Sequence, residues 1–154
     1  MDFEKEPFRL YPISNDNVNS NKTLNIFSIY QNPNDNNFVW LGSDDGLNKY
    51  DLKGKTSKKF QHIEKNLNSI PGNLIRGIQS SSNHELWLGT DKGLSLMKDV
   101  NNSFTNYDLK NETNHYVVDY NNIYNLSMDD YGNLWIASNL AGIVKFDTKN
   151  KTKQ

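Results

Sequence analysis

Three tryptophans recur along the chain at an almost constant interval. Trp40, Trp87 and Trp135 lie 47 and 48 residues apart, and each stands at the centre of the same phrase. The phrase consists of a short apolar run around the Trp, a polar turn that contains Gly, and a second apolar segment that ends at Asp. It occupies residues 39–51, 86–99 and 134–147. A repeat of this length indicates stacked supersecondary units, each of which packs against its neighbours.

The residues around each tryptophan predict four short antiparallel strands per repeat. An apolar segment precedes each tryptophan strand, at residues 26–29, 75–78 and 123–126. The Gly in the turn that follows is typical of a tight hairpin, and 60–63 and 104–107 mark a further strand. Turn residues interrupt the chain too often for a helical period. We therefore predict an all-β chain of about three four-stranded antiparallel β-propeller blades.

The repeats are out of phase with the two ends of this sequence. Residues 8–11 are similar to the fourth-strand phrase at 104–107, while the third repeat runs out at 149–154, where its fourth strand should start. We expect the outer strand and link of a preceding blade, two whole blades, and a third blade lacking its outer strand, at residues 1–20, 21–66, 67–112 and 113–154. Because closed propellers need four to eight blades, three repeats form either a portion of a larger propeller or one subunit of a ring. The first reading is favoured, since no capping repeat is apparent.

Composition and charge restrict the partners of this chain. Its 17 basic and 18 acidic residues nearly cancel, and no basic stripe is interleaved with aromatic residues, so we predict no contact with nucleic acid. Cysteine is absent, and His62, His84 and His115 share no metal-ligand spacing, so neither a metal site nor a cofactor is expected. We also expect no membrane contact by this segment, because it has no apolar run of spanning length and no signal-like start.

The composite phrase resembles the two-component regulator propeller repeat. Its most specific stretch is Leu-Trp-Leu-Gly-Thr-Asp-Lys-Gly-Leu at 86–94, the resemblance covers about residues 8–150, and Ala137 departs from it by replacing a Gly. In that family such repeats build seven-bladed propellers in the sensor region of hybrid histidine kinases of Bacteroidetes. The resemblance implies a periplasmic or extracellular location, an oligosaccharide ligand, and a kinase outside this chain. It also implies that the rest of a sensor ectodomain is the protein partner, whereas the ring interpretation of the blade count predicts a second copy of the chain.

A second resemblance concerns the turn before the third tryptophan. Residues 130–135, Asp-Tyr-Gly-Asn-Leu-Trp, resemble the Asp-box hairpin of sialidase-type propellers, with Met128 where that motif has Ser or Thr. The hairpin is structural even in sialidases, so it does not favour an enzyme. A sialidase or lyase would need clustered arginines beside acidic residues, yet Arg occurs only at Arg9 and Arg76. We predict no catalytic residues.

Aromatic residues are the candidates for ligand contact. An indole is able to stack on a sugar ring, but three tryptophans at one repeat position indicate packing between blades. Aromatic residues that do not repeat are better candidates, because recognition of a ligand breaks the symmetry of the blades. The candidates are Tyr116, Tyr120, Tyr124 and Tyr131. The alternative function is a protein-interaction scaffold that assembles into a ring, and the less favoured one is a sialidase-type enzyme.

Overall fold

The computed structural model describes residues 24–83, 85–98, 103–112, 117–139 and 142–153. Within these residues every regular element is a β-strand, and the strands form three four-stranded antiparallel sheets and one two-stranded hairpin. No helix of membrane-spanning length and hydrophobicity occurs in this described part of the chain. The all-β prediction is confirmed.

Each sheet is built from four strands that are consecutive in the sequence. The first blade contains β1 (Ile26–Asn32), β2 (Asp35–Ser43), β3 (Gly46–Asp51) and β4 (Thr56–Phe60). The second contains β5 (Ile75–Ser80), β6 (Leu86–Thr90), β7 (Gly93–Lys98) and β8 (Ser103–Tyr107). The third contains β11 (Ile123–Met128), β12 (Asn133–Ser138), β13 (Gly142–Asp147) and β14 (Thr152–Lys153).

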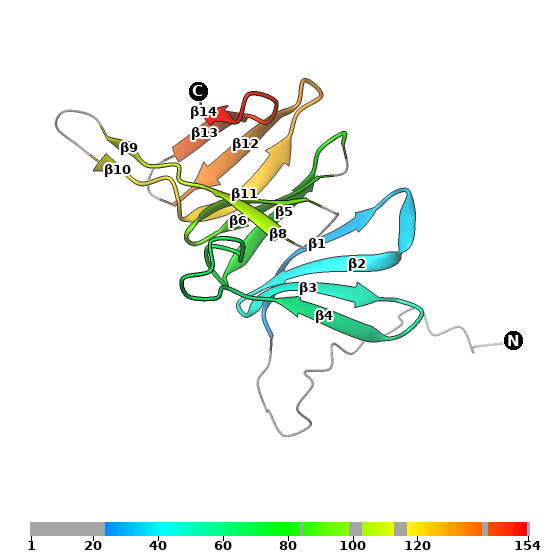
Figure 1. The fold of residues 1–154 in the computed structure, drawn as a ribbon. Helices are drawn as coiled ribbons and strands as arrows, with labels where there is room; N and C mark the ends of the chain where they lie inside the picture. The colour runs from blue at the N-terminus through cyan, green and yellow to red at the C-terminus, as the bar shows by residue number, and fades with distance from the viewer. Residues whose placement is uncertain (1–23, 84, 99–102, 113–116, 140–141, 154) are drawn as a thin grey trace, which may run out of the picture.

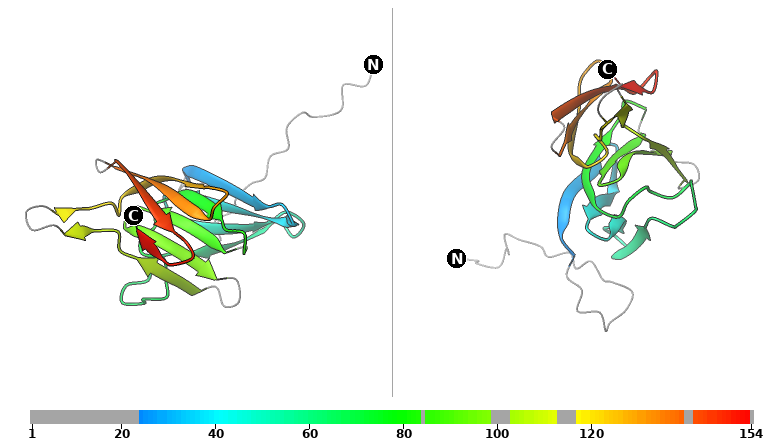
Figure 2. Two further views of the ribbon diagram at one scale, coloured as in Figure 1. Left: turned by 90° about the horizontal axis from the view of Figure 1, so that it is seen from above. Right: turned by 90° about the vertical axis from the view of Figure 1, so that its left-hand side faces the viewer.

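The three sheets lie next to one another in the order of the sequence, as Figures 1 and 2 show. The first strand of each blade is an edge strand, and β5 contacts both β1 and β11. A separate hairpin of β9 (Asn111–Glu112) and β10 (Val117–Val118) links the second blade to the third and projects beyond the sheets in Figure 2. The order of strands is that of propeller blades, each antiparallel from its inner to its outer strand.

Apolar side chains are buried between the sheets, in two layers. The layer between the first and second blades consists of Leu47, Phe60, Ile70, Ile75, Ile78, Leu86, Leu88, Met97 and Phe104. The layer between the second and third blades consists of Trp87, Leu94, Leu96, Leu109, Ile123, Leu126, Leu134, Ile136, Val144 and Phe146. The second blade therefore has both faces covered, which explains its near-continuous apolar strands.

The tryptophans do not share one environment. Trp87, in the middle blade, is fully buried, Trp40 is partly buried, and Trp135 is 40% exposed. The prediction that all three pack between blades is therefore wrong for Trp135. The side of the third blade that carries Trp135 and Ile143 has no described blade against it, and Ile143 is also exposed. The presence of a following blade, rather than the residue type, decides how far the indole is buried.

Turns explain why the first and third phrases end at an aspartate. Oδ1 of Asp51 accepts hydrogen bonds from the backbone of Lys53 and Gly54 at 2.8 and 3.0 Å. Asp147 holds the corresponding turn of the third blade through two backbone bonds of 2.8 and 3.0 Å. Lys151 there has a φ of 59°, close to the 52° of Lys55 in the first blade. The same type of turn therefore reverses the chain after β13, so that the residues that follow run antiparallel to it.

Because of this turn, the prediction for the outer strand of the third blade is wrong. The sequence predicts that this blade lacks its outer strand, but Thr152 and Lys153 pair with Asp147 and Phe146 as the two-residue β14. The β13–β14 turn starts the strand, and the sequence ends soon afterwards. The other predicted outer strand, at residues 8–11, lies outside the described residues.

The Asp-box-like turn is structural, although a different aspartate holds it. Asp129, not the aligned Asp130, accepts backbone hydrogen bonds from Tyr131 and Asn133 at 3.0 and 2.7 Å. Its Oδ2 also accepts a 3.1 Å bond from the Trp135 indole nitrogen. Desolvation alone would raise the pKa of Asp129, but these hydrogen bonds outweigh it and lower the pKa below 3.8. The carboxylate thus joins the β11–β12 turn to β12.

Acid is expected to destabilise the chain through these turn carboxylates. The pKa values of Asp51 and Asp147 are also lowered from 3.8, mainly by backbone hydrogen bonds from Gly54 and Asn150. Because the folded pKa values lie below the unfolded ones, the stabilisation is complete above about pH 4 and is lost as the pH falls through the folded values. We expect the urea midpoint to be lower at pH 3 than at pH 7. In a triple Asp→Asn variant at positions 51, 129 and 147 this pH-dependent drop should shrink; an equal drop in both proteins would exclude the three carboxylates as its source.

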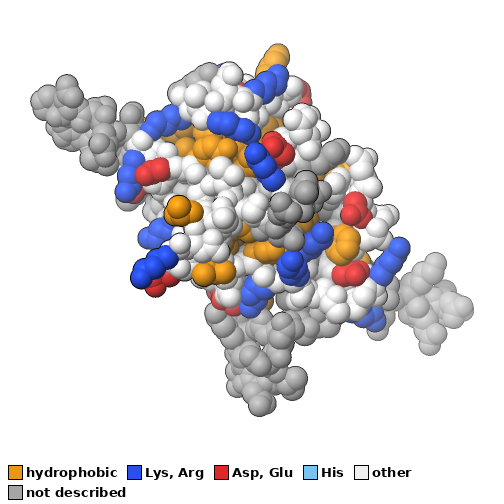
Figure 3. All heavy atoms as spheres, in the orientation of Figure 1, with side chains coloured by type: hydrophobic (Ala, Val, Ile, Leu, Met, Phe, Trp, Pro, Cys, Tyr) orange, Lys and Arg blue, Asp and Glu red, His pale blue; other side chains and the backbone are white. Residues whose placement is uncertain are grey.

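The surface carries no single dominant charge on the face that Figure 3 presents. Lysine and arginine side chains are interspersed there with acidic and apolar ones. This distribution agrees with the net charge of -1. It gives that face no continuous basic track of the kind that follows a nucleic-acid backbone.

Candidate functional site

The predicted tyrosines lie on different elements. Tyr120 lies in the link before β11 and packs, half-buried, against the second apolar layer. Tyr124 is half-exposed on β11, with the Arg76 guanidinium carbon 4.2 Å from its ring centroid. Tyr131 is 83% exposed in the β11–β12 turn. Tyr116 lies outside the described residues. The described tyrosines therefore do not assemble one common surface around a ligand-sized hollow.

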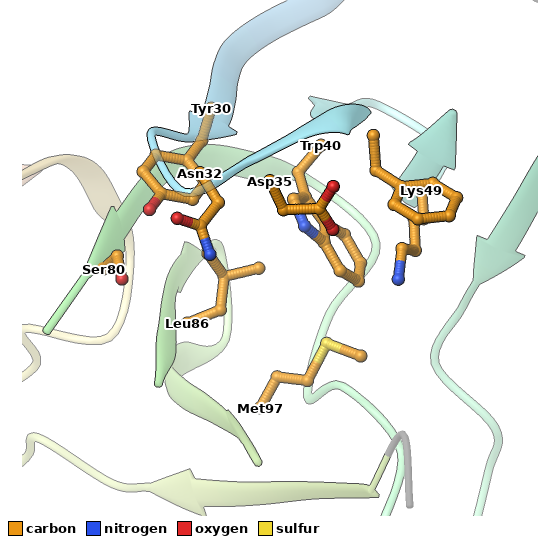
Figure 4. Close-up of a pocket in the computed structure, with 9 residues that line it drawn as sticks. Tyr30, Asn32, Asp35, Trp40, Lys49, Ser80, Leu86 and Met97 are labelled. Carbon is orange, nitrogen blue, oxygen red and sulfur yellow. The ribbon is translucent and has the colours of Figure 1, made fainter. Parts of the chain in front are cut away.

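A hollow of about 70 Å³ opens between the first and second blades, near the β1–β2 turn. Figure 4 shows side chains from the first blade converging on it over the edge of the second. It is lined by Tyr30, Asn32, Asp35, Phe38, Trp40, Lys49, Ser80, Leu86 and Met97. We name this feature the Trp40 hollow. Sequence reasoning missed it.

Three residues that line the Trp40 hollow differ in type from the residues at the equivalent positions of the second blade. Tyr30 and Lys49 both lie directly opposite Trp40 in the register, and Phe38 precedes it by two residues. The second blade carries different residues at these positions around Trp87, namely Gln79, Leu96 and Glu85. Aligning the repeats position by position would therefore have identified Tyr30 and Phe38 as non-repeating aromatic residues.

Packing around the indole differs between the first blade and the second. Trp87 forms a triangle with Tyr107 and Phe146, with ring centroids 5.3 to 5.6 Å apart, and Lys151 lies 4.6 Å above its ring. In the first blade Phe60 takes the place of Tyr107, and its ring centroid lies 6.0 Å from that of Trp40.

Met97 occupies in the second blade the position that Phe146 occupies in the third. Each of the two residues pairs with the residue that directly precedes the tryptophan of its own blade. The unbranched methionine covers less of Trp40 than a phenylalanine ring would. This side-chain difference between neighbouring blades helps to leave the hollow open beside Trp40.

Polar groups surround the aromatic faces of the Trp40 hollow. Lys49 Nζ lies 4.1 Å from the Phe38 centroid and 5.1 Å from that of Trp40, and among the described residues no carboxylate forms a salt bridge with it. Asp35 accepts two hydrogen bonds from Asn37, at 3.1 and 2.9 Å. Aromatic faces with a few convergent polar groups are typical of a small-molecule site. At about 70 Å³ the hollow admits a substituent or a ring edge rather than a whole sugar ring.

A larger hollow of about 580 Å³ lies between the second and third blades, but its chemistry is different. Its lining combines polar side chains with Met128 and contains no aromatic side chain. Glu85 and Lys151 pair across it at 3.7 Å. No group of three or more metal-ligating side chains occurs among the described residues. This hollow therefore offers hydrogen bonds without a stacking face.

One stretch of the third blade matches a known family. Residues 118–140 fit the family model described as two component regulator propeller. These residues carry this family's repeat. The resemblance inferred from the tryptophan phrase is therefore confirmed, although the phrase at 86–94, which is the most specific by eye, lies outside the matched residues.

Solved propeller structures resemble the larger part of the chain. The extracellular domain of a B. thetaiotaomicron protein described as a hybrid two component system, BT4673, matches 87% of this chain at 22% identity with a TM-score of 0.69. A second such domain, from BT3049, matches 94% at 17% identity with a TM-score of 0.57. This chain spans only 18% and 25% of their lengths. At these identities the similarity shows the fold alone, and no curated protein matches the chain.

Proposed function

We propose that this chain is part of the extracellular sensor region of a hybrid two-component system. The main support is its alignment with the extracellular domain of BT4673 over 87% of its length. The regulator propeller repeat at 118–140 supports the same conclusion. In this proposal the chain lies in the periplasm or outside the cell, and a kinase elsewhere in a longer polypeptide produces the output.

We further propose that the chain binds an oligosaccharide and catalyses no reaction. The aromatic faces of Tyr30, Phe38 and Trp40 suit the C–H face of a pyranose ring, with one ring edge entering the Trp40 hollow. Lys49 and Asn32 supply donors for sugar hydroxyl groups at the rim. Rigid blades would then transmit the ligand-induced reorientation to neighbouring domains.

Substitutions that copy the second blade test this site. Tyr30→Gln removes an aromatic face, and Lys49→Leu fills the space beside Trp40 in the way that Leu96 does beside Trp87. We expect each to weaken oligosaccharide binding about fivefold in calorimetric titration, because stacking and hydrogen bonding each contribute on the order of 1 kcal/mol. Tyr131→Gln, at an exposed tyrosine outside the hollow, is the matched control. Unchanged binding in both hollow variants would contradict the proposal.

A second candidate function is assembly through the two outer faces of the stack. Ile26 and Ile29 of the first blade are 40% and 69% exposed, although their counterparts in the second and third blades are buried. Trp135 and Ile143 are exposed on the opposite face. A second copy, or a further part of a sensor ectodomain, would cover both faces by repeating the contact between blades. Light scattering tests the self-assembly: a dimer of twice 17.8 kDa supports it, and a monodisperse monomer contradicts it.

A further inference from the structure

A β-bulge recurs at one position in the first strand of every blade. The pairing register shifts between Ile26 and Ser28 in β1 and at the equivalent places in β5 and β11. Each shift leaves one extra residue without a pairing partner. These bulge residues are Phe27, Arg76 and Tyr124. Since a bulge redirects the side chain of its extra residue, the three side chains leave the regular alternation at the same level of the stack.

The three bulge residues lie on neighbouring strand edges. β5 contacts β1 on one side and β11 on the other, so Arg76 lies between the strands that carry Phe27 and Tyr124. Phe27 and Tyr124 are each 49% exposed, so each of the two neighbouring strands carries an accessible aromatic ring. We call Phe27, Arg76 and Tyr124 the bulge row.

Arg76 is held in place but keeps unused donors. Its Nη1 donates a 2.8 Å hydrogen bond to Asn122 Oδ1 and lies 3.5 Å from the Ile123 carbonyl oxygen. Its guanidinium carbon lies 4.2 Å from the Tyr124 ring centroid. No described carboxylate forms an ion pair with it, and neither Nε nor Nη2 bonds a described residue. The guanidinium is therefore preorganised, with one edge available to an anion.

We infer that the bulge row binds the carboxylate group of an acidic sugar. Nε and Nη2 of Arg76 form the planar fork that receives a carboxylate through two parallel hydrogen bonds. The half-exposed Tyr124 ring lies against the guanidinium, and Phe27 lies on the neighbouring strand β1; in the proposal these two rings offer faces to the sugar ring that carries the carboxylate. The inference rests on the proposed oligosaccharide binding, but it uses residues that take no part in the Trp40 hollow.

Charge selectivity tests this site on the full chain. The probes are oligomers of galacturonate, mannuronate and hyaluronan, each compared with its carboxyl-reduced neutral counterpart by calorimetric titration. We expect at least one acidic oligomer to bind, and its neutral counterpart to bind at least about tenfold more weakly, because the charge-assisted bonds are lost. If none of the three acidic oligomers binds, or if reduction leaves the affinity unchanged, the inference is wrong.

Variants locate the binding within the chain. Arg76→Gln should weaken binding at least about tenfold, and Arg76→Lys should also weaken it because an ammonium group lacks the fork. Lys98→Gln removes the same charge from an exposed side chain on β7 and should leave the affinity within about twofold. If the Lys98 and Arg76 variants lose the same amount of affinity, the effect depends only on net charge and the proposed site is wrong. Far-UV circular dichroism checks that each variant is folded.

The Tyr30→Gln variant separates this inference from the Trp40 hollow. Binding of the acidic oligomer should survive that substitution. If it is lost in Tyr30→Gln and retained in Arg76→Gln, the bulge row is excluded and the hollow is the binding site. If neutral oligosaccharides fail to bind while the acidic oligomer binds through Arg76, the bulge row stands and the hollow is excluded.

Discussion

Replacing Trp87 with alanine is expected to remove a large part of the stability of the chain. The indole is fully buried between the second and third blades and contacts the rings of Tyr107 and Phe146 at centroid distances of 5.6 and 5.5 Å. Removing a buried Trp costs about 3–5 kcal/mol through lost burial and the cavity left behind. Because a domain of this size is stable by only about 5–15 kcal/mol, the loss is a large part of the total.

Urea denaturation followed by far-UV circular dichroism measures this loss. Trp135→Ala is the matched control, since Trp135 occupies the same repeat position but is 40% exposed. We expect it to cost about 1 kcal/mol, including its hydrogen bond to Asp129. Equal destabilisation by the two substitutions would mean that Trp87 does not lie between two blades.

The second large effect is expected at Gly89, where the second and third blades approach closely. A Cβ atom added there would lie 2.5 Å from Cγ2 of Ile123 and 3.2 Å from Cγ of Leu126. Both partners belong to the next blade, and Ile123 is fully buried, so neither side chain moves away without disturbing the layer. Gly89→Ala should therefore destabilise the chain by about 1–3 kcal/mol, the usual range for overpacking.

The third blade supplies the control for this prediction. Ala137 stands at the position of Gly89, and its side of the third blade has no described blade against it. Ala137→Gly should cost only about 0.5–1 kcal/mol, the effect of glycine within a strand. Both values come from urea unfolding curves. A Gly89→Ala protein as stable as the natural sequence would contradict the close contact between the blades.

The fold was predictable because one phrase occurs three times. A single strand pattern at 86–99 would be ambiguous, but the same apolar, turn and aspartate positions recur in each repeat and specify the same four strands. The turn at Asp147 was less evident, because two residues of β14 contribute little pattern. The partial exposure of Trp135 could not be read from its own repeat, since it depends on whether another blade covers that face.

The candidate sites were predictable only in part. Tyr124 was singled out as a non-repeating aromatic residue and is now part of the proposed bulge row. The same criterion applied to the first blade would have selected Tyr30 and Phe38. What no single repeat reveals is that Met97 leaves Trp40 partly uncovered, because that contact joins side chains of two different blades.

Fluorescence quenching by acrylamide tests the stacked arrangement most directly. Three proteins are needed, each retaining one tryptophan and carrying phenylalanine at the other two positions. The structure predicts that Trp87 is the least accessible to the quencher, Trp40 is intermediate, and Trp135 is the most accessible. If Trp87 is quenched as readily as Trp135, the middle blade is not enclosed by its neighbours, and the stacked-blade account is wrong.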